Sequence, residues 1–130
     1  MLVVDASAAL EAASARDGFS LIADSELVAP ALMWSEALSV LHETVWRKDI
    51  SLDLGVQIRD RLLAAPIERR DPETLRADAW DIAEKLGWAK TYDAEYVALA
   101  RLLGCRLLTV DERLRRGAGH LATIVGPTEV

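Results

Sequence analysis

Short apolar runs alternate with longer helical segments along the whole chain, and this alternation limits the possible folds more than any other feature. Runs of strand type occupy residues 2–4, 27–29, 66–69, 106–110 and 122–125, and Pro30 closes the second of them. Strands that alternate with helices are typical of βαβ units, which place strands parallel in one sheet. The pattern predicts an α/β fold with a central, mainly parallel sheet.

The intervening segments carry apolar residues at helical spacing. Helices are expected over residues 6–15, 19–25, 31–48, 51–65 and 93–103, and a single turn over 112–116. Asp71-Pro72-Glu73 has the features of a helix start, with an N-cap, a proline at the first position and an acid in the first turn. That helix should end at Gly87.

Bulk properties restrict the class of protein. A chain of 130 residues, 52% of them hydrophobic, fits a single globular domain over residues 1–130. No apolar run approaches the roughly 20 residues of a membrane span, and the N-terminus lacks the features of a signal peptide. The one cysteine, Cys105, excludes an internal disulfide, so a cytoplasmic location is expected. The net charge of −6 disfavours passive nucleic-acid binding but not a metal-dependent nuclease.

Four carboxylates stand out by their positions. Asp5 and Asp111 directly end apolar strand runs, Asp93 opens a helix, and Glu36 lies inside another helix. Because the carboxyl ends of parallel strands meet at one edge of a sheet, Asp5, Asp93 and Asp111 should be neighbours there. Clustered carboxylates repel one another unless a hard cation neutralises them. The set therefore points to Mg²⁺ or Mn²⁺.

Each of these residues also has a purely structural interpretation. An Asp between a strand and a helix is often an N-cap, and helical periodicity places Glu36 at the border of the apolar face, where a solvated side chain is common. Ser7 and Thr109, each two residues from an Asp, either support the carboxylates or serve as a cap and a strand residue. Arg113, Arg115 and Arg116 either hold a substrate phosphate or form a solvated cationic turn.

The ordered motifs resemble the PIN-domain family, and more narrowly its VapC-type ribonuclease toxins. They are Val4-Asp5-Ala6-Ser7-Ala8, the Ser35-Glu36 pair, Tyr92-Asp93-Ala94 with Val97-Ala98-Leu99-Ala100, and Leu108-Thr109-Val110-Asp111-Glu112. The resemblance covers essentially the whole chain. It implies a three-layer α/β/α fold, Mg²⁺- or Mn²⁺-dependent endoribonuclease activity, homodimerisation and inhibition by a cognate VapB-type antitoxin. It also implies that Asp5, Glu36, Asp93 and Asp111 bind the metal.

Three functional hypotheses follow. In the first, Asp5, Asp93 and Asp111 bind one or two divalent ions and Glu36 is a further ligand or positions the attacking water. In the second, the protein is a non-catalytic binding domain whose acids engage a partner. In the third, Asp5 is a phosphoacceptor, although Ser7 stands where an Asp-x-Asp phosphatase needs its second acid.

Overall fold

A five-stranded sheet forms the centre of the computed structural model, which describes residues 1–130. Its strands follow the order β3-β2-β1-β4-β5, and every neighbouring pair is parallel. The strands are β1 (Leu2–Val4), β2 (Leu27–Ala29), β3 (Ile67–Arg69), β4 (Arg106–Leu108) and β5 (Ile124–Val125). The predicted parallel sheet is confirmed, and the N-terminal strand lies at its middle.

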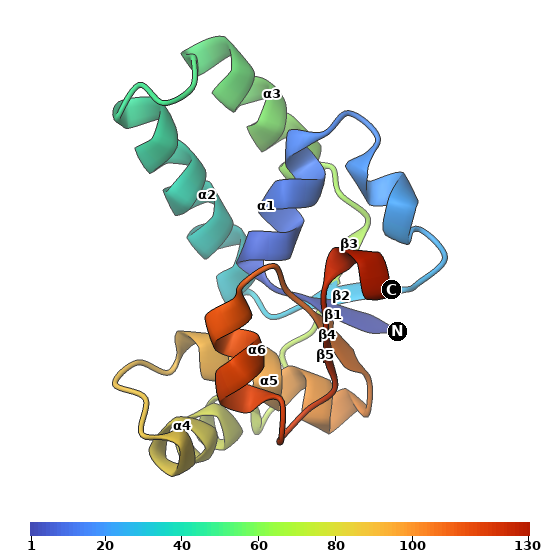
Figure 1. The fold of residues 1–130 in the computed structure, drawn as a ribbon, viewed down its shortest axis with the longest axis vertical. Coiled ribbons are helices and arrows are strands. Elements are labelled where there is room, and N and C mark those ends of the chain that lie inside the picture. Colours follow the sequence, from blue (N-terminus) through green and yellow to red (C-terminus); the bar gives the residue numbers. More distant parts are fainter.

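Helices cover both faces of this sheet. Figure 1 shows the first three α-helices on one side of the strands and the last three on the other. The elements are α1 (Ala6–Ser14), the 3₁₀ helix η1 (Gly18–Ile22), α2 (Leu32–Trp46), α3 (Leu52–Leu63), α4 (Leu75–Leu86), α5 (Tyr92–Leu103), α6 (Glu112–Ala118) and the 3₁₀ helix η2 (Pro127–Glu129). The three-layer α/β/α architecture is therefore confirmed. None of these helices combines the length and the apolar character that a membrane crossing requires.

The central strands are apolar at every position because both of their faces are covered. All three residues of β1 and of β2 are buried, which is the pattern of a parallel sheet between two helical layers. Helix α5 packs on β1 and β4 on one face and on α4 on the other. As a result, every residue from Ala94 to Ala100 is buried, and the helix that begins beside the acids is held rigidly.

The start predicted at Asp71-Pro72-Glu73 for the helix that ends at Gly87 was wrong. Helix α4 begins at Leu75, after a turn closed by a hydrogen bond from the Leu75 N–H to the Pro72 carbonyl. The Asp71 carboxylate does not cap it, because Asp71 accepts instead from the Ala31 N–H at 3.1 Å and pairs with Arg69 at 3.4 Å. Asp71 thus links the end of β3 to the start of α2.

Other boundaries differ in the C-terminal quarter of the chain. Strand β4 ends at Leu108, so Asp111 does not directly follow a strand as predicted. The Thr109 N–H still donates to the Val125 carbonyl, but the N–H groups of Val110 and Asp111 donate to side-chain hydroxyls instead of to a neighbouring strand, as described below. The turn expected at residues 112–116 is the seven-residue helix α6. Strand β5 contains only Ile124 and Val125.

Candidate active site

Asp5 stands at the carboxyl end of the central strand and is only 4% exposed. Its Oδ1 accepts hydrogen bonds from the Ser7 hydroxyl at 2.7 Å and from the Ala8 N–H at 2.9 Å. Its Oδ2 accepts from the Thr109 hydroxyl at 2.5 Å. Asp5 is therefore the N-cap of α1 as well as a member of the acid set, and its carboxylate is fixed from both sides.

Ser7 and Thr109 connect the end of β1 to the loop after β4. The Thr109 hydroxyl accepts from the Asp111 N–H at 3.0 Å while it donates to Asp5. The Ser7 hydroxyl accepts from the Val110 N–H at 3.2 Å and lies 3.2 Å from the Thr109 hydroxyl. Two hydroxyls thus replace strand pairing at Val110 and Asp111 and set the position of Asp111 relative to Asp5.

Asp111 caps the helix that follows it. Its Oδ1 accepts from the N–H groups of Arg113 at 2.9 Å and Leu114 at 3.4 Å. The Oδ2 atom takes no part in these bonds. One carboxylate oxygen is therefore used to start α6, and the other is available for chemistry at the edge of the sheet.

Glu36 and Asp93 come from helices on opposite sides of the sheet. Glu36 lies in the second turn of α2, where it is half-buried, and its Oε1 accepts from the Tyr96 hydroxyl at 2.5 Å. Asp93 lies in the first turn of α5 and is exposed. The solvated position that periodicity favoured for Glu36 is not the observed one, because the buried Tyr96 ring of α5 lies beside it.

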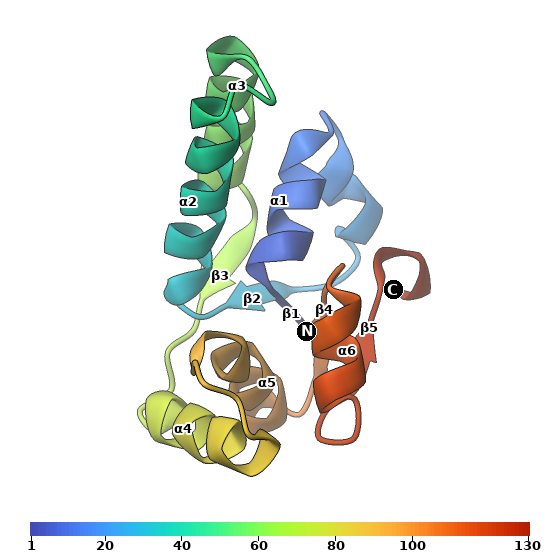
Figure 2. The ribbon, with the colours of Figure 1, turned by 60° about the vertical axis from the view of Figure 1, so that its left-hand side comes forward.

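Three of the four acids line one open cavity of about 490 Å³. Glu36, Asp93 and Asp111 reach it from α2, α5 and the start of α6, and Asp5 lies behind them at the end of β1. The remaining lining residues come from the α4–α5 connection and from α6: Gly87, Trp88, Ala89, Lys90, Tyr92, Arg113 and Leu114. Figure 2 shows α5 and α6 on the side of the strands opposite α2.

Burial, with a further contribution from repulsion between the acids, raises the pKa of Asp5, Glu36 and Asp93. Burial raises the pKa of Asp5 against the opposing effect of its three hydrogen bonds, and Asp93 raises it further. Burial also raises the pKa of Glu36, which Asp93 and Asp5 increase and the Tyr96 hydrogen bond decreases. Although Asp93 is exposed, the surrounding protein shields its carboxylate from part of the solvent and so raises its pKa; Asp111 raises it further, while Arg113 lowers it. The four carboxylates therefore interact as one group.

The donor set fits a hard divalent cation. All four candidate ligands are carboxylates, which Mg²⁺ and Mn²⁺ prefer. Repulsion between the acids adds to the effect of burial in raising the pKa of Asp5, Glu36 and Asp93, and a bound cation would relieve that repulsion. As placed here, no three acidic, histidine or cysteine side chains are close enough to share one ion. Metal binding would therefore require the carboxylates to draw together.

The three arginines predicted to bind substrate lie in different surroundings. Arg113 lines the acid cavity, and its Nε lies 3.7 Å from Asp111 Oδ1. Arg115 forms a two-pronged pair with Glu129 of η2, at 2.5 and 2.6 Å. Arg116 is exposed and does not line the acid cavity. Only Arg113 is thus placed beside the acids.

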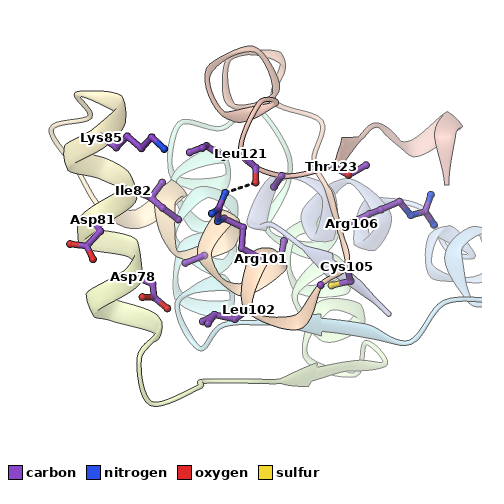
Figure 3. A pocket seen from close by; sticks show the side chains of 14 residues that line it. Asp78, Asp81, Ile82, Lys85, Arg101, Leu102, Cys105, Arg106, Leu121 and Thr123 are labelled. Carbon is purple, nitrogen blue, oxygen red and sulfur yellow. Dashed lines mark hydrogen bonds between the residues drawn. The ribbon is translucent and has the colours of Figure 1, made fainter.

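A second cavity, larger than the one lined by the acids, lies elsewhere in the molecule. It measures about 770 Å³ and lies between α4, α5 and the segments that precede β4 and β5, which places it at the opposite edge of the sheet from Asp5. Figure 3 shows Arg101 near its centre, donating to the Leu121 carbonyl at 2.7 Å. Asp78, Asp81, Lys85 and Arg106 surround it with mixed charge. Its size alone does not assign it a function.

Sequence reasoning missed Tyr96, Lys90 and Tyr92. Tyr96 lies three residues after Asp93 on the apolar face of α5, so its position was indistinguishable from that of a core residue. Lys90 and Tyr92 line the acid cavity from the connection before α5. Their proximity to Asp93 in the sequence was the available signal for both.

Comparison with known proteins places this arrangement in a family. The model of the PIN domain matches residues 2–119. Ribonuclease VapC9 of Mycobacterium tuberculosis is 39% identical over 116 residues, which is 88% of each chain. Ribonuclease VapC12 of the same organism is 31% identical over 128 residues, covering 95% of this chain and 97% of the relative.

A solved structure supports the fold. The crystal structure of PAE2754 from Pyrobaculum aerophilum superposes with a TM-score of 0.72, covering 98% of this chain and 91% of that one at 22% identity. At this identity the match speaks for the fold alone. The family match over residues 2–119 and the similarity to VapC ribonucleases show that this protein belongs to the PIN domain family.

Proposed function

We propose that this protein is a divalent-metal-dependent endoribonuclease that hydrolyses RNA phosphodiester bonds. The observation that carries the proposal is the meeting of Asp5, Glu36, Asp93 and Asp111 at one edge of the sheet, with three of them lining a single cavity. The relatives that cover most of the chain are named ribonucleases, which supports RNA as the substrate.

The residues have separable tasks in this proposal. Asp5, Asp93 and Asp111 would hold Mg²⁺ or Mn²⁺, and Glu36 would be a further ligand or would orient the attacking water. A bound divalent ion supplies a more acidic water and stabilises charge on the phosphoryl oxygens in the transition state. Ser7 and Thr109 keep Asp5 in place through the hydrogen bonds described above.

Cationic side chains beside the acids would receive the RNA backbone. Arg113 and Lys90 line the same cavity as the acids, and guanidinium and ammonium groups bind phosphate. In this position they offset part of the repulsion that a net charge of −6 imposes on RNA. Arg115 is engaged with Glu129 and Arg116 lies outside the cavity, so we assign substrate contact to Arg113 first.

We further propose that the protein is the toxin of a toxin–antitoxin pair, acts in the cytoplasm as a homodimer and is inhibited by a VapB-type antitoxin. The VapC names of the relatives support the pairing with a VapB-type antitoxin. Large apolar side chains on the surface offer area for such contacts, since Trp46 is 76% and Trp80 is 65% exposed. Co-expression with the product of a small neighbouring gene, followed by light scattering of the purified complex, tests both assemblies.

Cleavage of RNA by the purified, partner-free chain tests the activity. With Mg²⁺ or Mn²⁺ present we expect cleavage that EDTA abolishes, and a loss of roughly 100-fold in Asp93→Asn, which keeps the side-chain shape but removes the charge. Asp24→Asn, at an exposed aspartate in the turn after η1, is the matched control and should retain full activity. Cleavage that persists in chelator, or an active Asp93→Asn, would contradict the proposal. A chain that neither binds Mn²⁺ nor cleaves RNA would favour a non-catalytic binding domain.

A further inference from the structure

Glu36 and Tyr96 form the one side-chain hydrogen bond that joins the two helical layers beside the acid cavity. Glu36 belongs to α2 on one side of the sheet and Tyr96 to α5 on the other, and the two residues are 60 positions apart. The Tyr96 side chain is 1% exposed, so its ring has no freedom to leave. Its hydroxyl therefore presents a fixed donor to Glu36 Oε1.

The environment of the hydroxyl explains why it points toward Glu36. The ring lies in the buried run 94–100 of α5, which packs on β1. A buried phenol needs a hydrogen-bond partner, and a carboxylate is the strongest acceptor available. The phenol has one proton to donate, and Glu36 Oε1 accepts it at 2.5 Å.

This contact leaves Glu36 with one free oxygen. Oε1 is occupied at 2.5 Å, and Oε2 is the atom that remains for the cavity. We propose that Tyr96 is a positioning residue that fixes the Glu36 carboxylate by its Oε1, so that Glu36 meets a divalent ion or its bound water through Oε2 alone. This inference rests on the proposed function, because it concerns the same acid set.

The Tyr96→Phe variant removes the donor and keeps the ring. Loss of a group that orients a metal ligand costs about 10- to 100-fold in metal affinity, so we expect Mn²⁺ to bind the full-length variant at least about tenfold more weakly. Mn²⁺ titration followed by electron paramagnetic resonance measures the affinity, and the spectrum of the bound ion should change with the freed carboxylate. Thermal unfolding of both proteins checks that the variant is folded.

A double-mutant cycle separates positioning from general support of the fold. If Tyr96 acts through Glu36, Tyr96→Phe should weaken Mn²⁺ binding in the wild-type background but change it less than twofold in the Glu36→Gln background. An equal loss in both backgrounds would overturn the inference, since the effect would then not pass through Glu36. Wild-type affinity and an unchanged spectrum in Tyr96→Phe would overturn it as well.

Two further measurements keep the inference independent of folding and of the proposed activity. Glu36→Asp retains the charge but shortens the side chain by one methylene, which withdraws the carboxylate from the Tyr96 hydroxyl. It should therefore weaken Mn²⁺ binding as Tyr96→Phe does, even if Tyr96→Phe does not fold. Wild-type Mn²⁺ affinity in Glu36→Asp would contradict the inference. Mn²⁺ binding by the wild type tests the proposed function alone. If the wild type does not bind Mn²⁺, both the proposed function and the inference about Tyr96 are contradicted. If the wild type binds Mn²⁺, the ratio between wild type and variant tests the role of Tyr96.

Discussion

At the residue scale, the acids are held by hydroxyls whose role is visible only in three dimensions. Asp5 takes hydrogen bonds from Ser7, two positions away, and from Thr109, 104 positions away. The sequence predicted the position of Asp5 at the end of a strand, because an apolar run followed by an acid is a local pattern. For Ser7 and Thr109 the sequence left two interpretations open, support of the carboxylates or a purely structural role. It could not decide between them, because the partner of Thr109 is remote along the chain.

Thr109→Val should damage the site and the fold together. The substitution keeps the shape but removes the donor to Asp5 and the acceptor for the Asp111 N–H. Leaving a buried acceptor without its partner costs about 1–3 kcal/mol, and we expect RNA cleavage to fall by roughly tenfold or more. Thr109→Ser, which restores the hydroxyl, is the control. Chemical denaturation and cleavage assays on the two variants measure both effects; equal behaviour of Val and Ser would contradict the expectation.

Glu95 should be a source of instability at neutral pH. It is 8% exposed, and its buried Oε1 has no hydrogen-bond partner. Burial raises the pKa of Glu95 from 4.5, and although Arg76 opposes this, the folded protein binds the proton more tightly than the unfolded chain. Stability from this group is therefore greatest at acidic pH and decreases as the pH rises above about 4.5.

Glu95→Gln tests this directly. We expect the variant to be about 1 kcal/mol more stable than the wild type at pH 7. The difference should shrink as the pH falls from 7 toward 4.5, because the folded wild-type side chain takes up its proton at a pH above 4.5. Urea denaturation at several pH values measures it. Glu84→Gln, at an exposed position of α4, is the control and should show no such dependence.

At the element scale, two of the acids also start helices, so their structural and chemical roles are combined. Asp5 caps α1 and Asp111 caps α6. From the sequence, capping and metal binding were alternative roles for these acids. A carboxylate has two oxygens, however, and Asp111 uses only Oδ1 for its cap. Helix boundaries were less predictable: the cap proposed at Asp71 failed because that carboxylate bonds to Ala31, 40 residues away.

Substitution of Asp111 should separate these two roles. Asn is as good an N-cap as Asp, while Ala is a poor one. We expect Asp111→Asn to keep nearly wild-type stability and Asp111→Ala to lose about 1 kcal/mol. Both should lose metal binding and RNA cleavage, because both remove the charge. Thermal unfolding and Mn²⁺ titration of the pair distinguish the roles, and wild-type cleavage by Asp111→Asn would remove Asp111 from the acid set.

At the scale of the whole molecule, the alternation of strands and helices was sufficient to predict the α/β fold. Each element is recognised from the spacing of apolar residues within its own short segment of sequence. The cavity was not predictable, since its walls come from α2, α5, α6 and the α4–α5 connection. Glu36 illustrates the limit: its place depends on Tyr96, which approaches from the opposite helical layer. Only the resemblance to the PIN-domain family, and not the helical periodicity around Glu36, indicated this residue as a candidate metal ligand.

Divalent ions should stabilise the whole molecule, and more strongly at higher pH. The raised pKa values of Asp5, Glu36 and Asp93 mean that protons compete with a cation for these carboxylates. Without metal, stability from these three groups decreases as the pH rises above their ordinary values; with metal, the deprotonated form is the one that binds. At a Mn²⁺ concentration about 100-fold above Kd we expect a gain of about 2.7 kcal/mol. Thermal unfolding with and without Mn²⁺ between pH 5 and pH 8 measures this, and a gain independent of pH would contradict it.

The position of β1 at the middle of the sheet has a consequence for synthesis. Strand β1 is synthesised before both of its neighbours: it can pair with β2 soon afterwards, but it must wait about 100 residues for β4. Until Leu108 and Thr109 have been added, the emerging polypeptide lacks both the second neighbour of β1 and the hydroxyl that fixes Asp5. A nascent or truncated chain that stops before Thr109 therefore has no assembled acid site, and the order of translation delays the proposed activity until β4 and the loop after it have been made.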